Sequence, residues 1–240
     1  MEADGLLAQL RDDPGRTALF FDVDGVLAPI VSRPEEARVP DETREELRRL
    51  AGRYGLVACV SGRTSAGARA IVGLDELVYV GEHGLELDRD APLWRSQLRA
   101  FADSVDWPVE DKGLTLSFHY RNVVDQEAAE RTLLEVAERA RDEGLVPRFG
   151  RKVLEIRPPV EANKGTAVRH LLDERGLRRA LYAGDDTTDL DGFRALEADD
   201  VELAVRVAVV SPESPQGLRE SADVVVGTPA ELLETVLRRL

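Results

Sequence analysis

The sequence predicts an α/β protein with a parallel-sheet core and an inserted second domain. Near both ends of the chain, short apolar runs alternate with amphipathic helical patterns, which is typical of a parallel sheet covered on both faces. The middle of the chain instead shows two-faced strands beside a charged helix. We therefore expect a doubly wound, Rossmann-like core formed by residues 1–87 and 160–240, with an α+β cap at 88–159.

The first half of the expected core alternates strands with helices. Leu47, Leu50 and Ala51 form an apolar stripe among charges, and Asp41 precedes them as a candidate N-cap. Reading the whole segment in this way predicts strands at Thr17–Asp22, Leu56–Ser61 and Val78–Gly81, and helices at Asp41–Tyr54 and Ser65–Val72.

The expected cap begins after Gly84, where the periodicity changes. Alternation over Leu114–Arg121 predicts a strand with one packed face and one solvated or ligand-facing face. Val153–Arg157 has the same character, and Asp125–Arg141 is a charged amphipathic helix. These patterns indicate antiparallel strands with helices on one face.

The strand and helix alternation returns at Lys164. Gly176 is a natural stop for the first helix, and Thr228 with Pro229 favours the start of the last one. The expected helices are Lys164–Glu174, Thr187–Glu197 and Thr228–Leu240, and the expected strands are Ala180–Gly184, Leu203–Val210 and Asp223–Val226.

Charge and composition exclude several classes of protein. Lys and Arg total 32 against 46 Asp and Glu, a net charge of −14, and 43% of the residues are hydrophobic. The apolar content is sufficient for a folded core. The acidic excess argues against binding to nucleic acid or to an anionic membrane. It does not exclude a small phosphorylated ligand, because a metal ion can reverse the local field.

The single cysteine and the N-terminal segment set further expectations. Cys59 lies in an apolar run, where a small buried residue is expected, and no disulfide can form within the chain. The segment after Met1 has no basic region that leads into an apolar stretch, and no apolar run approaches the ~20 residues that span a bilayer. We therefore expect a cytoplasmic protein, and a monomer.

Carboxylates follow two of the predicted strands. Asp22 and Asp24 stand where the first strand ends, and Asp185, Asp186 and Asp189 follow a later strand. Ligands of open parallel sheets bind at the carboxyl ends of strands, and neighbouring carboxylates repel unless a cation lies between them. Mg²⁺ suits such oxygen-rich sites, since it is commonly held by one or two carboxylates with substrate phosphate and water.

Two further segments have features that favour the binding of an anion. Ser61 and Gly62 follow the second strand and precede a helix, which brings a hydroxyl and backbone N–H groups to a helix N-terminus. Lys164 opens the helix at the return from cap to core, where its charge can neutralise a phosphoryl oxygen. A plain turn and a solvated lysine are the alternative readings of these two segments.

These four segments, in this order, resemble the haloacid dehalogenase-like phosphohydrolases. The resemblance implies that Asp22 is the nucleophile, Asp24 the general acid/base, and Lys164 the stabilising lysine. It also implies that Ser61 binds phosphate. Mg²⁺ would be held by the Asp22 carboxylate, the Asp24 carbonyl and Asp185, with Asp186 and Asp189 in support.

Flanking segments narrow the resemblance to the trehalose-6-phosphate phosphatases. Those that carry it are Gly81–Glu86, Glu110–Gly113, Phe118–Arg121, Glu155–Pro158 with Asn163–Gly165, and Gly184–Asp189. It implies an aspartyl-phosphate mechanism on trehalose 6-phosphate in trehalose biosynthesis. Sugar recognition by Glu110, Lys112 and Glu155 of the cap is also implied, and His83 adjoins the strand end that faces the site. His119 lies on the polar face of a cap strand.

Two positions depart from the family pattern. Val26 stands where the first motif usually has Thr, and Leu190 where the last motif usually has an acid. Asp189 and Asp191 remain, so metal binding is expected to survive. Reduced turnover or another substrate stays open: a sucrose-phosphate or glycosyl-phosphoglycerate phosphatase, or a non-catalytic sugar-phosphate sensor. A receiver-type signalling domain is disfavoured by the chain length and the inserted cap.

Overall fold

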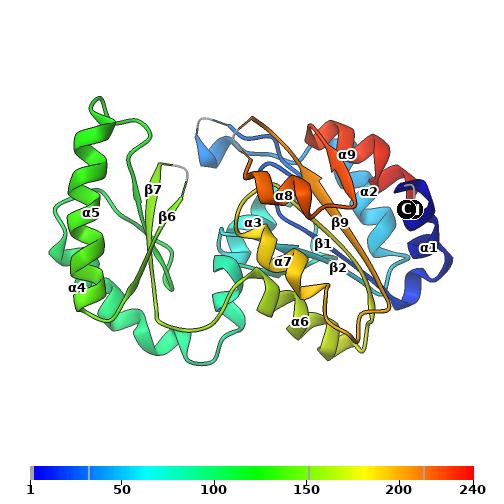
Figure 1. Cartoon of the computed structure of the whole chain (residues 1–240), viewed down its shortest axis with the longest axis horizontal. Coiled ribbons are helices and arrows are strands. Elements are labelled where there is room, and N and C mark those ends of the chain that lie inside the picture. The colour runs from blue at the N-terminus through cyan, green and yellow to red at the C-terminus, as the bar shows by residue number, and fades with distance from the viewer. Residues whose placement is uncertain (1–2, 32, 151, 213) are drawn as a thin grey trace. The chain divides into compact units, whose positions relative to one another are not determined.

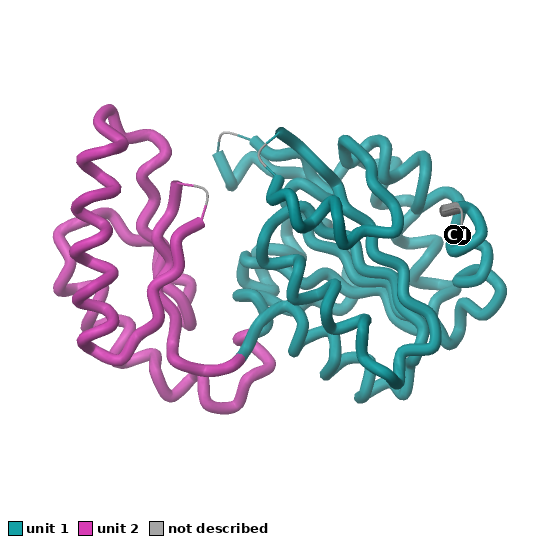
Figure 2. The backbone as a smooth tube through the Cα atoms, in the orientation of Figure 1, with its two compact units in different colours: residues 1–84, 162–240 teal, residues 85–161 magenta. Residues whose placement is uncertain are grey.

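The chain folds into two compact units in the computed structural model, which describes residues 3–31, 33–150, 152–212 and 214–240 (Figures 1 and 2). Unit 1 combines Met1–Gly84 with Ala162–Leu240, and unit 2 is Leu85–Glu161. Unit 2 is therefore an insertion between two segments that fold together.

Unit 1 is built on a parallel sheet with the strand order β10-β9-β8-β1-β2-β3 (Figure 1). Its strands are β1 (Thr17–Phe21), β2 (Leu56–Val60), β3 (Val78–Val80), β8 (Arg179–Gly184), β9 (Leu203–Val209) and β10 (Val224–Val226). Because β1 pairs with both β2 and β8, the carboxyl ends of these three strands meet at one edge of the sheet.

Helices cover both faces of this sheet, as a doubly wound core requires. Successive residues of β1 point to opposite sides: Leu19 and Phe21 pack in one apolar cluster, and Ala18 and Phe20 in the other. The first cluster includes residues of α1 (Ala3–Asp12), α2 (Asp41–Ala51), α3 (Ser65–Val72) and α9 (Pro229–Thr235), and the second residues of α6 (Lys164–Arg175), α7 (Asp189–Ala195) and α8 (Gln216–Glu220). Short 3₁₀ turns lie at Pro14–Arg16, Pro34–Glu36, Glu82–Leu87 and Leu237–Arg239.

Unit 2 has an antiparallel sheet and its own apolar cluster. The strands follow the order β4-β5-β7-β6 and comprise β4 (Glu110–Asp111), β5 (Leu116–His119), β6 (Val146–Gly150) and β7 (Val153–Arg157). Residues of α4 (Arg95–Ser104) and α5 (Gln126–Asp142) pack with the apolar residues of β5 and β7, and a 3₁₀ turn spans Ala91–Trp94.

The fold class expected from the sequence is confirmed, with local corrections. On the face of the cap strands that was expected to be solvated or ligand-facing, Thr115, Ser117 and Glu155 are buried, so that face is not fully solvated. Asp41 does not cap α2 with its side chain; it is the first helical residue, and Pro40 occupies the N-cap position. Thr228 does cap α9, and Gly176 ends α6 in the left-handed conformation.

Several elements differ in length from the expectation or were not expected. The helix predicted from Thr187 begins at Asp189, since the preceding residues form a loop, and the last α-helix stops at Thr235. The elements α1, α4, α8, β4 and β6 were not predicted from the sequence. Within the described residues, no helix is long and apolar enough to cross a membrane.

Candidate active site

The first acidic residue of the site, Asp22, directly follows β1. Its amide donates to the carbonyl of Ala183 at 3.0 Å, which continues the pairing of β1 with β8. The carboxylate Oδ1 accepts from the amide of Val23 at 2.7 Å. Gly25 then turns with φ +83°, and a Cβ there would lie 2.3 Å from Oδ2 of Asp185. The loop after β1 therefore needs glycine to pass this close to the second acidic segment.

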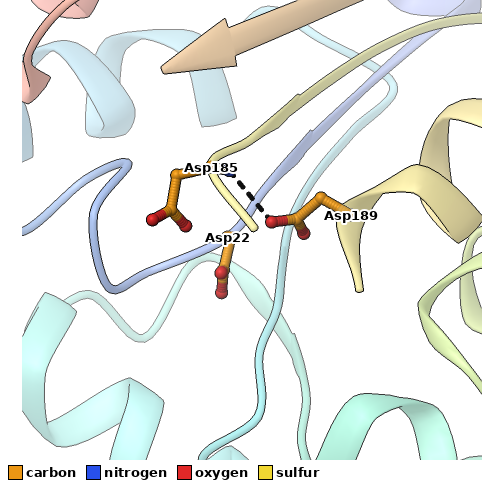
Figure 3. Close-up of side chains that lie close together, drawn as sticks. All are labelled: Asp22, Asp185 and Asp189. Atoms are coloured by element: carbon orange, nitrogen blue, oxygen red, sulfur yellow. Dashed lines mark hydrogen bonds between the residues drawn. The ribbon is translucent and has the colours of Figure 1, made fainter. Parts of the chain in front are cut away.

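Three carboxylates meet at the ends of β1 and β8 (Figure 3). Asp22, Asp185 and Asp189 each offer an oxygen, and these atoms lie within 4.8 Å of one another. All three residues are buried. Carboxylates this close repel strongly without a cation, and oxygen donors suit a hard divalent ion. The chemistry of this donor set therefore fits a metal ion.

Lys164, at the start of α6, brings a cation into the cluster. Its Nζ lies 2.9 Å from Oδ2 of Asp22 and 2.6 Å from Oδ1 of Asp189, and the side chain is 1% exposed. The Asn163 side chain caps α6 and fixes its first turn. A Cβ on Gly165 would lie 2.4 Å from the carbonyl of Asp191, so α6 approaches α7 closely at this point.

Asp189 receives four donors, two at each oxygen. Oδ1 accepts from Lys164 and from the hydroxyl of Tyr182 at 2.8 Å. Oδ2 accepts from the amides of Asp185 and Asp186 at 2.9 and 3.0 Å (Figure 3 shows the first). A carboxylate has about four acceptor positions. Asp189 is therefore saturated by protein donors, and Asp22 and Asp185 are the better direct metal ligands.

Burial and neighbouring charges perturb the titration of the cluster. Burial raises the pKa of Asp22 to about 7, and Asp189 adds to the rise, although Lys164 opposes it. Burial alone would lower the pKa of Lys164, but Asp189 and Asp22 outweigh it and raise that pKa. Lys164 is therefore charged at neutral pH.

Asp24, the second residue of the first motif, is held by an arginine. Nε and Nη2 of Arg63 lie 2.6 and 2.7 Å from the two oxygens of Asp24, and Nη2 also donates to the carbonyl of Pro34 at 3.0 Å. A bidentate pair of this kind fixes both the position and the plane of a carboxylate. Arg63 thus ties the loop after β2 to the loop after β1.

Ser61, Gly62 and His83 lie on adjoining loops after β2 and β3. Ser61 is buried, and its Oγ accepts from the amide of Arg63 at 3.2 Å. A Cβ on Gly62 would lie 2.7 Å from the imidazole of His83, so only glycine permits this approach. Glu82 and His83 both have positive φ, 47° and 56°. Such backbone strain in non-glycine residues clusters at functional sites.

The expected sugar-binding residues lie on the sheet of unit 2. The strand register places Glu110, Ser117 and Glu155 in one row across β4, β5 and β7. Nζ of Lys112 lies 3.9 Å from Oε1 of Glu155, and Nε2 of His119 lies 2.8 Å from Oε2 of Glu110. The cap residues thus form two charged or polar pairs within one sheet.

Sequence reasoning missed two side chains that organise this site. Tyr182 reads as an ordinary core residue of a strand, and nothing in the pattern shows that its hydroxyl reaches Asp189. Arg63 stands next to Ser61 and Gly62 in the sequence, but its partner is 39 residues away. Asp186 donates its amide to Asp189, and its own carboxylate accepts from the amide of Thr187. Its support of a metal stays a prediction.

The doubly wound core, the inserted second unit and the acidic strand ends are features of the haloacid dehalogenase-like fold. Within that class, the trehalose-phosphatase family model matches residues 20–108 and 97–223. The chain therefore belongs to the trehalose-phosphatase family.

Curated relatives and solved structures agree with this family. A rice (Oryza sativa subsp. japonica) protein named probable trehalose-phosphate phosphatase 2 is 30% identical over 261 residues, 91% of this chain and 66% of the rice protein. A Mycobacterium marinum trehalose-phosphate phosphatase is 34% identical over 80% of this chain and 54% of its own length. The chain thus spans less than two thirds of the length of either relative.

The solved structures match almost the whole chain. A trehalose-6-phosphate phosphatase related protein has a TM-score of 0.73 at 25% identity and covers 92% of this chain and 95% of its own. The C-terminal domain of the Candida albicans trehalose-6-phosphate phosphatase has a TM-score of 0.76 at 24% identity, with coverages of 99% and 96%. At 24% identity, the similarity to the Candida albicans domain supports the fold alone.

Proposed function

We propose that the protein is a Mg²⁺-dependent phosphatase that hydrolyses trehalose 6-phosphate to trehalose and phosphate. The observation that carries the proposal is the buried cluster of Asp22, Asp185 and Asp189 with Lys164 against it. The choice of trehalose 6-phosphate as the substrate comes from the names of the relatives. The excess of acidic residues does not exclude a small phosphorylated substrate, because a metal ion can reverse the local field, and we propose that the protein acts as a cytoplasmic monomer.

The proposed reaction has two steps. An oxygen of Asp22 attacks phosphorus, the bond from phosphorus to the sugar oxygen breaks, and an aspartyl-phosphate forms. Asp24, which must carry a proton and release one oxygen from Arg63 for this step, gives that proton to the departing sugar oxygen. Asp24 then takes a proton from a water that attacks phosphorus, which releases phosphate and regenerates Asp22.

Charge neutralisation supports both steps. Lys164 lies beside Asp22 and neutralises a phosphoryl oxygen, while Ser61 and the amide of Gly62 donate to the others. Because phosphoryl transfer makes few covalent demands on a protein, placement of these donors supplies most of the rate. A bound Mg²⁺, held by the Asp22 carboxylate, the Asp24 carbonyl and Asp185, would act as a Lewis acid on the phosphoryl group.

The two departures from the family pattern lie in packed positions. Val26 is fully buried in the first apolar cluster, and Leu190 is partly buried against the second. Neither removes one of the proposed catalytic groups. We therefore propose an active enzyme rather than a sugar-phosphate sensor.

The direct test is phosphate release in the presence of Mg²⁺ from three substrates. We expect kcat/KM for trehalose 6-phosphate to exceed that for sucrose 6-phosphate and glucose 6-phosphate. A preference for another sugar phosphate would change the proposed substrate but not the proposed phosphatase mechanism. No release from any of them, or from an aryl phosphate, would leave the sensor as the better reading.

Asp24→Asn is expected to slow turnover of trehalose 6-phosphate by about 10²–10⁴-fold, the usual value of general acid–base catalysis. An aryl phosphate with a good leaving group needs the proton less, so the variant should form the aspartyl-phosphate from it and then stall. Mass spectrometry of quenched, digested protein should find the added phosphate on the peptide that contains Asp22. Asp41→Asn, which breaks an exposed pair with Arg44, is the matched control and should turn over normally.

Glu110→Ala and Lys112→Ala are expected to weaken use of trehalose 6-phosphate far more than use of a small aryl phosphate. Loss of hydrogen bonds to charged groups should cost about 10- to 100-fold in kcat/KM for the sugar substrate. Glu138→Ala, on the exposed surface of α5, is the control for loss of a cap charge. Equal losses on both substrates would instead assign these residues to the fold or to the phosphoryl chemistry.

A further inference from the structure

Tyr182 lies at the centre of the core with its ring fixed on several sides. The residue is fully buried in β8. Its ring stacks on Phe20, with 6.5 Å between centroids, and meets the edge of Phe193 at 6.0 Å. A Cβ on Gly192 would lie 2.5 Å from the ring, so α7 passes directly against it. The position of the hydroxyl is therefore set by packing.

The hydroxyl of Tyr182 and the ammonium of Lys164 donate to the same oxygen of Asp189. Oδ1 of Asp189 accepts from Tyr182 at 2.8 Å and from Nζ of Lys164 at 2.6 Å. The same lysine reaches Asp22 at 2.9 Å. Tyr182 and Lys164 both donate to Asp189, and Lys164 also reaches Asp22, so one continuous chain of hydrogen bonds and ion pairs runs from the packed core to the proposed nucleophile.

We propose that Tyr182 is a positioning residue for phosphoryl transfer, acting through Asp189 on Lys164. This rests on the proposed function. With the hydroxyl present, Oδ1 of Asp189 is shared between two donors. Without it, Lys164 would be the remaining donor to that oxygen, and the ammonium would be drawn toward Asp189 and away from Asp22 and the phosphoryl group. The aromatic ring of Tyr182 accounts for the packing, so we assign the hydroxyl a role in the rate of phosphoryl transfer.

The test compares three variants under the same conditions. Tyr182→Phe removes the hydroxyl and keeps the ring. Tyr54→Phe removes the same group from another buried tyrosine, whose hydroxyl donates to the main-chain oxygen of Leu240 at 3.1 Å. Phe193→Leu loosens the packing around Tyr182 and leaves its hydroxyl in place. Each is measured for Tm, for kcat and KM on an aryl phosphate, and for affinity to orthovanadate with Mg²⁺ by calorimetry.

Orthovanadate readily adopts five-coordinate geometry when bound and so mimics the transition state of phosphoryl transfer, and inorganic phosphate serves as the ground-state probe. For Tyr182→Phe we expect kcat and vanadate affinity to fall together by about 10- to 100-fold, as for loss of a hydrogen bond to a charged group. KM and phosphate affinity should change by less than about threefold, since ground-state binding is largely kept. Tm should stay near that of Tyr54→Phe. Both controls should keep wild-type vanadate affinity.

Three results would overturn the inference. Wild-type kcat and vanadate affinity in Tyr182→Phe would show that the hydroxyl does not act on the site. Loss of folding in Tyr182→Phe, with Tyr54→Phe intact, would assign the hydroxyl to stability. An equal loss of vanadate affinity in Phe193→Leu would assign the effect to packing. Failure of the wild-type protein to bind vanadate and to hydrolyse any phosphate monoester would instead contradict the proposed function.

Discussion

Asp22→Asn is expected to abolish turnover of both trehalose 6-phosphate and an aryl phosphate, with a loss of about 10⁴-fold or more, because the nucleophile is removed. The substitution preserves shape but replaces a carboxylate that lies 2.9 Å from Lys164 and within the acidic cluster. No covalent phosphoenzyme should form, even from a substrate with a good leaving group. Phosphate release and mass spectrometry of the digested protein measure the two effects.

The fold of Asp22→Asn should survive, which separates loss of chemistry from loss of structure. Lys164 keeps Asp189 as a partner, and Asn can still accept from the amide of Val23. Asp191, which the sequence pattern left as a candidate acid for metal binding, pairs with Arg194 and is not among the three clustered carboxylates, so Asp191→Asn is the matched control. Asp191→Asn should retain wild-type turnover. Near-normal turnover by Asp22→Asn would show that another group attacks phosphorus.

The strand ends of the core could be predicted from the sequence because each carries a pattern and a chemical signal together. An apolar run followed by Asp22, Ser61 or Asp185 marks both the strand and its carboxyl end. In a parallel sheet these ends share one edge, so residues far apart in the sequence could be expected in one site. Their convergence is confirmed for Asp22 and Asp185, which lie in the same acidic cluster.

Elements without such a pattern were missed for physical reasons. β6 is an edge strand of unit 2 that contains Pro147 and is largely exposed, so it shows neither alternation nor a continuous apolar run. β4 has two exposed residues, Glu110 and Asp111, and its pairing with β5 defines it rather than its composition.

The contacts that organise the site could not be predicted because they depend on side-chain reach across the fold. A tyrosine at an inward position of a strand indicates core packing, and the approach of Asp189 to its hydroxyl depends on how α7 begins. The bidentate pair of Arg63 with Asp24 likewise needs the loops after β1 and β2 in contact. The sequence shows which polar side chains are present, but which of them contact one another depends on the tertiary structure.

Removal of the metal is expected to abolish phosphatase activity, and re-addition of Mg²⁺ should restore it. Asp22, Asp185 and Asp189 lie within 4.8 Å of one another with one lysine against them, so a divalent cation is needed to balance the charge. Metal-stripped protein in excess EDTA should therefore release no phosphate from either substrate. Full activity after verified metal removal would contradict the proposal.

Calorimetry of Mg²⁺ with the metal-stripped protein gives a readout that does not depend on turnover. Asp185→Asn should weaken Mg²⁺ binding by about 10-fold or more, as loss of a charged ligand implies. Asp191→Asn, two residues beyond Asp189 on α7, should not weaken it. A Mg²⁺ concentration 100 times the Kd should stabilise the wild-type fold by about 2.7 kcal/mol and raise its Tm.

The pH dependence of Mg²⁺ affinity follows from the titration of Asp22. Its pKa is raised from 3.8 to about 7, chiefly by burial, so the metal-free folded state holds a proton that the unfolded chain has already lost. Stability of the metal-free protein should therefore fall as the pH rises from about 4 to 7, where the unfolded state binds fewer protons. Mg²⁺ must displace that proton, so its affinity should increase from pH 6 to pH 8, with proton release on binding near pH 6. Calorimetry in two buffers of different ionisation enthalpy measures the released proton. A Mg²⁺ affinity that is constant over this range, with no proton release, would show that Asp22 does not contact the ion.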